Sequence, residues 1–323
     1  MLRTLVTGIA GFAGGHLAEY LTGLGHVELY GIRRGGTPAS DAGRAARAGR
    51  LYFGDLTDRA FVRAAVEEAR PDLVFHLAAQ ASIAAAWADP AGTIANNLVG
   101  EAHLLDAIAD LAPNARVLVV GSADEYGLVR PDELPVTEEQ PFRPTNPYAV
   151  SKIGQDMLGY QYHLARRLAV VRVRPFNHIG PGQRQDFVAS AFARQVAAAE
   201  AGLAPPVIRV GNLDARRDFS DVRDVVRAYW LALTRGQPGE VYNVASGRSV
   251  AIAEILRSLL SLSQRTLAVE RDLARLRPSD VPDMVGDASK LRRQTGWAPE
   301  RPLDVTLRDT LDYWRGAVSH QPR

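Results

Sequence analysis

An α/β fold with a doubly wound parallel sheet is the fold class that the sequence predicts, and two observations predict it. Short runs rich in Val, Leu and Ile alternate with longer helical patterns, as in TLVTG before GHLAEYLTGLG, or DLVFHLAA before AHLLDAIADL. Buried parallel strands are typically continuous apolar runs, and each needs a crossover helix before the next strand. A glycine-rich turn also joins the first run to the first helical segment. Strands alternating with helices in this way build a sheet covered on both faces.

The later part of the chain predicts a second, smaller α/β lobe interleaved with the first. Strands are expected at 27–32 and 116–122, and the loop-like RVRPFNHIGPGQ then marks a change of character. A helix at 187–203, a strand at 205–212, a helix at 224–233 and a strand at 239–246 follow, then a helix at 250–262. We expect residues 1–172 and about 214–246 in the sheet domain. Residues from about 173–213 and 247–323 are expected in the second lobe.

Composition narrows the classes of protein. The 323 residues are 46% apolar and 23% charged, and the formal net charge is +2, so nothing favours binding to nucleic acid or to a membrane surface. The sequence holds no cysteine, which excludes disulfides and thiolate catalysis. The apolar amino terminus is interrupted by glycines and Glu19, and falls short of the ~20 apolar residues of a membrane span. We expect a soluble, cytoplasmic protein without a metal site.

The turn VTGIAGFAG is the first candidate binding site. Gly8, Gly11 and Gly14 stand between the first strand and the first helix, together with Phe12 and Ala13. Glycines permit a tight turn and close backbone approach, and the positive end of the helix attracts a diphosphate. The spacing is G-x-x-G-x-x-G, not G-x-G-x-x-G, and glycines can also serve only to turn the chain. With a strand before it and a helix after it, the turn favours a Rossmann-type dinucleotide site.

The second strand ends in YGIRRGG, with Arg33 and Arg34 where a carboxylate would bind ribose hydroxyls. Arginine suits a 2′-phosphate instead, so NADP(H) is favoured, with NAD(H) left open as an alternative. Two solvated surface arginines are the alternative interpretation. The next strand ends are expected to lie beside the adenine and the rest of the cofactor, although small residues there could equally be plain packing. The residues concerned are Asp55, Leu56, Leu77, Ala78 and Ala79.

Several stretches together resemble the extended short-chain dehydrogenase/reductase family. They are TGIAGFAG, GDLTD, HLAAQ, GSADEYG and NPYAVSK, while RPFNHIGPGQ, RRDFSDVRD, VYNVASG and RPSDV resemble its nucleotide-sugar branch. The resemblance spans essentially the whole chain. It implies that Tyr148 and Lys152 form the Tyr-x-x-x-Lys pair of the family, with Ser122 as the third catalytic residue. Asn97 resembles the residue that steadies the central helix and a proton-relay water, although Asn96 or Asn97 could be a simple helix cap.

The chemistry implied for this trio follows from charge. A ketone that accepts a hydride becomes an alkoxide, so an acid must deliver a proton as that charge develops. Tyr148 is the expected acid, and an ammonium from Lys152 nearby would favour its anion. Lys152 would also bind the nicotinamide ribose, as in the family. The hydroxyl of Ser122 would polarise the carbonyl.

Within the branch, the sequence most resembles GDP-mannose 4,6-dehydratases and GDP-4-keto-6-deoxy-D-mannose reductases. The dehydratases resemble one another in carrying Glu two positions before the tyrosine that is Tyr126 here, where this chain has Asp124 after Ala123. Asp is one methylene shorter, so removal of the C5 proton should be crippled. Glu125 would point to the other face of a strand, but a slipped loop could present it. We therefore expect NADPH-dependent reduction of the C4 ketone to GDP-D-rhamnose, with dehydration as the alternative.

The resemblance also implies contacts to substrate and between subunits. His178 is expected near the nicotinamide, or else is a satisfied loop histidine. A noncatalytic dinucleotide-binding regulator is the alternative of a different class. The helical segments 91–111 and 148–167 resemble the pair that forms a homodimer in the family, although their apolar stripes could pack internally. The sequence does not distinguish guanine from uracil or thymine. The candidate substrate residues are Gln80, Asp124, Asn177, Arg209, Arg217 and Arg277.

Overall fold

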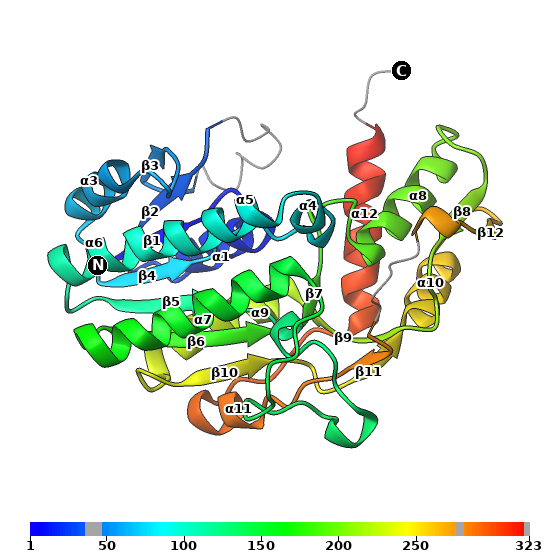
Figure 1. The fold of residues 1–323 in the computed structure, drawn as a ribbon. Coiled ribbons are helices and arrows are strands. Elements are labelled where there is room, and N and C mark those ends of the chain that lie inside the picture. Colours follow the sequence, from blue (N-terminus) through cyan, green and yellow to red (C-terminus); the bar gives the residue numbers. More distant parts are fainter. Residues whose placement is uncertain (36–46, 276–280, 320–323) are drawn as a thin grey trace.

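A seven-stranded parallel sheet forms the centre of the larger lobe (Figure 1). The structure is a computed structural model that describes residues 1–35, 47–275 and 281–319. Every neighbouring pair of strands in this sheet is parallel, which confirms the predicted fold class. In spatial order the strands are β3 (Arg50–Phe53), β2 (Val27–Arg33), β1 (Leu2–Thr7), β4 (Leu73–His76), β5 (Arg116–Val120), β6 (Ala169–Pro175) and β10 (Val241–Val244).

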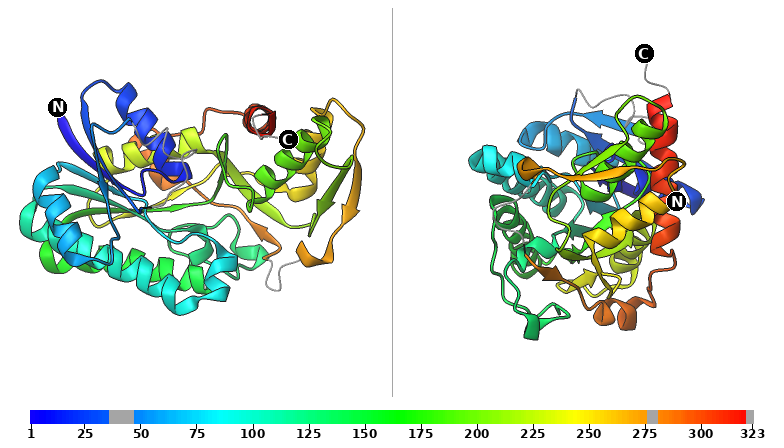
Figure 2. Two further views of the ribbon diagram at one scale, coloured as in Figure 1. Left: turned by 90° about the horizontal axis from the view of Figure 1, so that it is seen from above. Right: turned by 90° about the vertical axis from the view of Figure 1, so that its right-hand side faces the viewer.

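Helices cover both faces of this sheet, as the view from above shows (Figure 2). One face carries α1 (Phe12–Gly23) and α9 (Val222–Arg235), and α11 (Ser289–Thr295) packs against α9 and β10. The other face carries α3 (Arg59–Ala69), α6 (Gly100–Leu111) and α7 (Pro147–Arg166). Separate apolar cores fill the two sides. The strand order reverses between β1 and β4, and ligands of such folds bind at this switch point, beyond the carboxyl ends of the strands.

A nearly continuous helical run crosses the front of the larger lobe before α6 begins. It consists of α4 (Ile83–Ala88), α5 (Pro90–Ile94) and a π-helical turn, η1 (Ala95–Val99). Short 3-10 turns, η2 (Ala123–Glu125) and η3 (Pro131–Glu133), follow β5. Single π-turns inside helices widen the backbone by one residue and are frequent at functional sites. Here the turn places Asn97, which is 1% exposed, on the inner side of the run.

The second lobe lies to the right of the sheet in Figure 1 and has its own apolar core. A two-stranded sheet at its outer end pairs β8 (Val207–Val210) with β12 (Ala268–Arg271), and η4 (Leu273–Arg275) follows. A four-stranded sheet faces the larger lobe, with strands β7 (Asn177–Ile179), β9 (Arg216–Asp221), β11 (Ser249–Ala251) and β13 (Asp283–Met284). Its helices are α8 (Val188–Glu200), α10 (Ile252–Ser261) and α12 (Leu303–Ser319).

The chain passes between the lobes several times, at positions that differ in detail from the expected boundaries. β6 stays in the main sheet up to Pro175, and β9 pairs with strands of the second lobe although 214–246 was expected in the first. The segment around α11 returns to the first lobe, where the buried Trp297 donates from Nε1 to the Asp224 carbonyl (3.0 Å). We therefore propose boundaries at the ends of β6, β9 and β10, with α11 in the first lobe.

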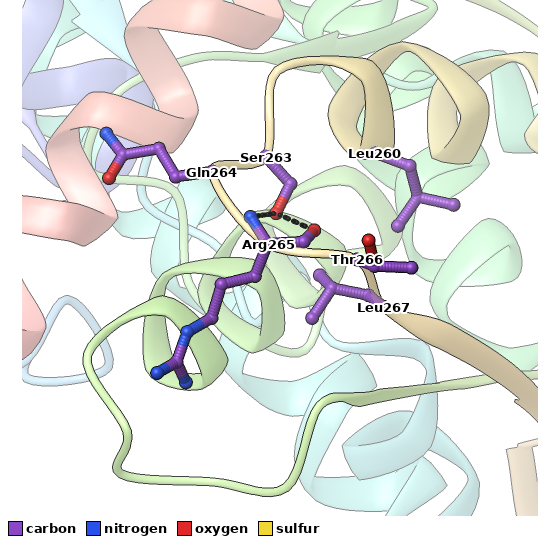
Figure 3. A pocket seen from close by; sticks show the side chains of 6 residues that line it. All are labelled: Leu260, Ser263, Gln264, Arg265, Thr266 and Leu267. Carbon is purple, nitrogen blue, oxygen red and sulfur yellow. Dashed lines mark hydrogen bonds between the residues drawn. The ribbon is translucent and has the colours of Figure 1, made fainter.

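No helix in the described ranges is both long and apolar enough to cross a membrane. A depression between α10 and β12 is lined by residues of the connecting loop, shown in Figure 3. The lining residues are Leu260, Ser263, Gln264, Arg265, Thr266 and Leu267. No candidate site residue is among these six, so this depression is separate from the candidate active site at the switch point of the sheet.

Candidate active site

The glycine turn is closed so tightly that two of its residues have no room for a side chain. Gly8 has a φ of +72°, and a Cβ there would lie 2.8 Å from the backbone nitrogen of Ala78. A Cβ at Gly14 would lie 2.1 Å from the Gly8 carbonyl oxygen. The first N–H groups of a helix have no intrahelical partner, and Gly11, which precedes α1, offers them no side-chain cap. The turn thus fits the diphosphate of a dinucleotide.

The two arginines after β2 lie at the edge of the same site, and each already has a partner. Arg34 forms an ion pair with Asp55 (Nε to Oδ2, 3.1 Å) and a hydrogen bond to Asn96. The guanidinium of Arg33 lies 5.0 Å from the centre of the Phe53 ring. The backbone N–H of Thr57 is the main cause that lowers the pKa of Asp55, so this carboxyl is ionised at neutral pH. The structure therefore places Arg33, Arg34 and Asp55 beside one another at the ends of β2 and β3.

The end of β4 is held close to the end of β1. The backbone nitrogens of Leu77 and Ala78 donate to the carbonyl and the hydroxyl of Thr7, at 3.3 and 3.2 Å. Residues 77–79 are half-buried, so the segment predicted to pass beside the cofactor borders the glycine turn.

Tyr148 and Lys152 lie in the first two turns of α7. Asn146 caps this helix by accepting a hydrogen bond from the backbone nitrogen of Ala149 (2.8 Å), and Pro147 is its first residue. The ammonium of Lys152 lies 6.0 Å from the centre of the Tyr148 ring. It donates to the Val120 carbonyl (2.8 Å) and to Oε1 of Gln155 (2.9 Å). An ammonium has three N–H groups, so one remains for a ligand.

The electrostatics of Tyr148 differ from the expectation that an ammonium favours its anion. Burial, and then the carboxylate of Asp124, raise the pKa of Tyr148, while a hydrogen bond with the Ser122 hydroxyl opposes this. The Lys152 ammonium points to Val120 and Gln155, and burial lowers the pKa of Lys152 to about 8. The phenol therefore keeps its proton at neutral pH, as a proton donor must.

Ser122 and its two acidic followers are arranged by the η2 turn. The oxygen of Ser122 accepts from the backbone nitrogen of Asp124 (3.1 Å), and the same hydroxyl is hydrogen-bonded to Tyr148. Glu125 is fully buried, accepts from the Ser122 backbone nitrogen (2.7 Å) and pairs with Arg174 (3.2 Å). Glu125 lies in a 3-10 turn and not on a strand, but its carboxyl points inward all the same. It cannot act as an elimination base in this position.

The side-chain amides of Asn97 and Gln80 form hydrogen bonds to other residues of the protein. The Asn97 amide donates to Ser151 Oγ (2.9 Å) and to the Gln80 carbonyl (3.2 Å), and its oxygen accepts from the Gln80 nitrogen (2.8 Å). It thereby ties the π-turn to α7. Both amide hydrogens of Gln80 are used, by Ser82 and by Thr93. A contact from Gln80 to substrate would need this loop to rearrange.

The candidates of the second lobe are distributed unevenly. The His178 ring stacks on Phe12 of the glycine turn (5.9 Å between centroids, 3° between planes), and burial lowers its pKa, so it is neutral. Asn177 is exposed beside it. Arg217 donates to the Val281 carbonyl (2.6 Å) at the inner sheet. Arg209 is exposed on β8, a strand that Figure 1 shows at the outer end of the second lobe. Arg277 lies outside the described residues.

A group of buried polar residues behind Lys152 was missed by the sequence prediction. Two of them, Gln155 and Asp156, follow Lys152 at helical spacings of three and four. The others interrupt apolar runs, and a polar residue inside such a run is the signal that could have found them. The group consists of His76, Glu101, Gln155, Asp156, Arg172 and Arg174.

A glycine turn at the switch point of a parallel sheet, with a Tyr-x-x-x-Lys helix beside it, defines an NAD(P)-dependent enzyme of the extended short-chain dehydrogenase/reductase type. Residues 5–310 match the family described as GDP-mannose 4,6 dehydratase, and the chain belongs to that family. Family membership alone does not determine the reaction. The family is named for dehydratases, whereas the proteins similar to this chain also include a reductase.

Similar proteins carry both activities in their names. A GDP-6-deoxy-D-mannose reductase from Pseudomonas aeruginosa is 37% identical over 319 residues, covering 99% of each chain. GDP-mannose 4,6 dehydratase 2 of Arabidopsis thaliana is 31% identical, over 95% of this chain and 85% of that protein. The structure of RMD from Pseudomonas aeruginosa complexed with NADPH superposes with a TM-score of 0.86 at 35% identity, covering 98% of this chain and 100% of that one.

Proposed function

We propose that the protein reduces the C4 ketone of GDP-4-keto-6-deoxy-D-mannose with NADPH and forms GDP-D-rhamnose, which is GDP-6-deoxy-D-mannose. One observation carries this proposal: a protonated Tyr148 lies beside Ser122, while no glutamate carboxyl occupies the position of an elimination base. Asp124 stands at that position, and Glu125 is buried against Arg174. The similarity to the reductase of Pseudomonas aeruginosa supports the same assignment.

The residues around the glycine turn fit a phosphorylated dinucleotide. A bound NADPH would supply the hydride to the carbonyl carbon. The first turn of α1 would hold the diphosphate, and Arg33 and Arg34 would hold the 2′-phosphate. Asp55 keeps Arg34 oriented, so an arginine and not a carboxylate is presented to the ribose. This favours NADPH over NADH, and the structure of RMD with NADPH supports it.

The catalytic roles follow from the hydrogens that these side chains can donate. Tyr148 donates its phenolic proton to the carbonyl oxygen, which becomes the new hydroxyl. Ser122 donates a hydrogen bond to the same oxygen, in place of the hydrogen bond that it makes with Tyr148 when no substrate is bound. The remaining N–H of Lys152 binds the nicotinamide ribose. We also assign Asn177, Arg217 and Arg277 to the substrate, and His178 to the nicotinamide.

A direct assay tests the proposal. The purified protein, mixed with NADPH and the keto sugar, should consume one equivalent of NADPH at 340 nm and yield GDP-D-rhamnose. Asp124→Ala should retain most of this activity, since reduction needs no base at that position. No loss of reduced-nicotinamide absorbance with the keto sugar would refute the assignment.

Dehydration of GDP-mannose is the second candidate, and the family description favours it. It would convert GDP-mannose to the keto sugar without net consumption of cofactor. The structure of the η2 turn argues against it, because the only glutamate of that turn is buried. Offering GDP-mannose alone, and analysing for keto sugar, separates the two reactions. Turnover of either compound would exclude a noncatalytic dinucleotide-binding regulator.

We further propose a homodimer. Apolar side chains are exposed along one side of α7 and on the helical run before α6, including Leu164 (63% exposed) and Trp87 (56%). Val150, Met157 and Tyr160 lie on the same helix at spacings that share a face with Leu164. An exposed apolar stripe of this kind is typical of an interface. Sedimentation should give a dimer, and Leu164→Glu should give a monomer.

A cytoplasmic location is the last part of the proposal. A chain without cysteine suits a reducing compartment, and it gains nothing from an oxidising one. Fractionation of the native cells should recover the protein with the cytosolic enzymes.

A further inference from the structure

A directed chain of hydrogen bonds runs inward from Lys152. Its ammonium donates to Oε1 of Gln155 (2.9 Å), so the Gln155 amide nitrogen faces the other way. That nitrogen lies 3.2 Å from Nε2 of His76, which must accept, and Nδ1 of His76 therefore donates to Thr7 Oγ1 (2.8 Å). Burial lowers the pKa of His76 to about 3, so the ring is neutral as this chain requires. The chain links the amine of α7 to the strand that enters the glycine turn.

Glu101 lies beside this chain of hydrogen bonds. Unlike the other buried carboxyls nearby, it is not paired with an arginine in the part of the protein that the structure describes. Asp156 pairs with Arg172 and Arg174, and Glu125 is held by Arg174 and the Ser122 nitrogen. Glu101 is 0% exposed, and within the described residues neither of its oxygens accepts a hydrogen bond of normal geometry. Burial raises the pKa of Glu101 well above its ordinary value, while the Lys152 ammonium and then a contact with Gln155 oppose this shift. Oε2 of Glu101 lies 3.7 Å from Nε2 of His76, the atom that Gln155 contacts. A buried carboxyl without such hydrogen bonds is destabilising unless a nearby charge compensates it.

We infer that Gln155 and Glu101 are positioning residues for the amine of Lys152. Gln155 holds the ammonium through its carbonyl oxygen, and the Glu101 carboxyl behind Gln155 keeps the amine protonated. The inference rests on the proposed function in which Lys152 binds the nicotinamide ribose.

The charge of Lys152 decides whether that contact exists. Two of its N–H groups are used by Val120 and Gln155, so a neutral amine has none left for a ligand, whereas an ammonium has one. Burial lowers the pKa of Lys152 to about 8, and the carboxyls of Glu101 and Glu125 oppose that shift. Burial raises the pKa of Glu101 itself, so its carboxyl is charged only because the ammonium of Lys152 lies nearby. Glu101→Gln removes this partner and should therefore leave the amine neutral at a lower pH.

Several elements bring titratable groups to the surroundings of Lys152, and of these the carboxyls of Glu101 and Glu125 raise its pKa. The groups are His76 from β4, Glu101 from α6, Glu125 from η2, Tyr148 and Asp156 from α7, and Arg172 and Arg174 from β6. The two arginines are paired with Asp156 and Glu125, so Glu101 is the member whose removal changes the field at Lys152 without freeing an arginine.

NADPH binding as a function of pH tests the inference without any sugar substrate. The dissociation constant is measured by nicotinamide fluorescence for the wild type, Glu101→Gln and Gln155→Glu. In the wild type, the affinity for NADPH should decrease as the pH rises through the pKa of Lys152, and this decrease is the alkaline limb of the pH profile. Glu101→Gln should move that limb to lower pH by about one unit, the usual effect of losing one nearby opposite charge. Gln155→Glu should move it to higher pH, because a carboxylate then contacts the ammonium.

Opposite shifts are the distinguishing result, because damage to packing would weaken binding at every pH. Asp110→Asn is the matched control: it removes a carboxylate from the exposed side of the same helix and should leave the limb in place. If Glu101→Gln fails to fold, Gln155→Glu alone tests the inference. A shift of its alkaline limb to higher pH supports the inference, and an unchanged limb contradicts it.

Two results would overturn it: a limb that stays in place in both variants, or the absence of NADPH binding by the wild type. Failure of the proposed function looks different. If NADPH binds with the shifts described and the keto sugar is not reduced, the assignment of the reaction fails while the positioning roles stand.

Discussion

Replacing Gly14 with alanine tests how tightly the glycine turn is closed. A Cβ at this position would lie 2.1 Å from the Gly8 carbonyl oxygen and 2.9 Å from the Ile9 Cα. Both atoms belong to the backbone, so no side-chain rotation relieves the overlap. Non-bonded heavy atoms pack at about 3.5 Å, so the turn and α1 must separate by about 1 Å.

The magnitude of the effect follows from that displacement. Overpacking of this kind lowers the free energy of unfolding by about 1–3 kcal/mol. A shift of about 1 Å would also break at least one hydrogen bond from the helix to a bound diphosphate. A hydrogen bond to a charged group contributes about 1.5–3 kcal/mol, which corresponds to a loss of NADPH affinity of about 10- to 100-fold.

The assay combines thermal unfolding with a fluorescence titration of NADPH. Gly23→Ala is the matched control, since Gly23 ends the same helix and a Cβ there has nothing within 4 Å. Alanine is preferred over glycine in helices, so this control should be as stable as the wild type or slightly more so. If Gly14→Ala matches Gly23→Ala in both melting temperature and NADPH affinity, the close approach of Gly14 and Gly8 is refuted.

Three further changes have defined outcomes. Tyr148→Phe should lower kcat for ketone reduction by about 10²–10⁴-fold, the usual contribution of a general acid, and should leave the affinity for NADPH unchanged. If the variant and the wild type have equal kcat values, Tyr148 is not the proton donor. Asp218 is buried and accepts hydrogen bonds from Ser246, Gly247 and Gly286, so Asp218→Asn should destabilise by about 1–3 kcal/mol in urea unfolding. His76 has a folded pKa of about 3 against 6.5 ordinarily, so the unfolded chain takes up its proton first and stability is lost as pH falls through this window. His76→Gln should flatten the urea midpoint over that range, and an unchanged slope would contradict the burial of a neutral ring.

Features that depend on neighbours in the sequence were predictable. The glycine spacing predicted the turn before α1, and the four-residue spacing of Tyr148 and Lys152 placed both on one helix, where α7 has them. The alternation of apolar runs and helical segments predicted the parallel sheet, which is confirmed. In each case a single local rule, such as a turn that tolerates only glycine, restricts the conformation strongly.

Features that depend on tertiary neighbours were not predictable. The pKa of Tyr148 is set by its burial and by Asp124 and Glu125, and the η2 turn rather than a strand orients these carboxyls. The pairing of β9 was also not predictable. Its sequence is compatible with pairing to β10 in the main sheet, whereas the structure pairs it with β11 and β13. Glu101 lies far from Lys152 in the sequence, and only the packing of α6 and α7 brings the two together.

The repeated passage of the chain between the two lobes has a consequence for how the protein can be divided. A gene fragment that stops after β6 would lack β10, which forms the edge of the main sheet, and α9, which covers one of its faces. The fragment would expose Val173 and Tyr126 of the core, side chains that the missing elements normally shield from water. Neither half is therefore expected to be a stable independent product, and swapping substrate specificity between relatives would require exchanging several short segments at once.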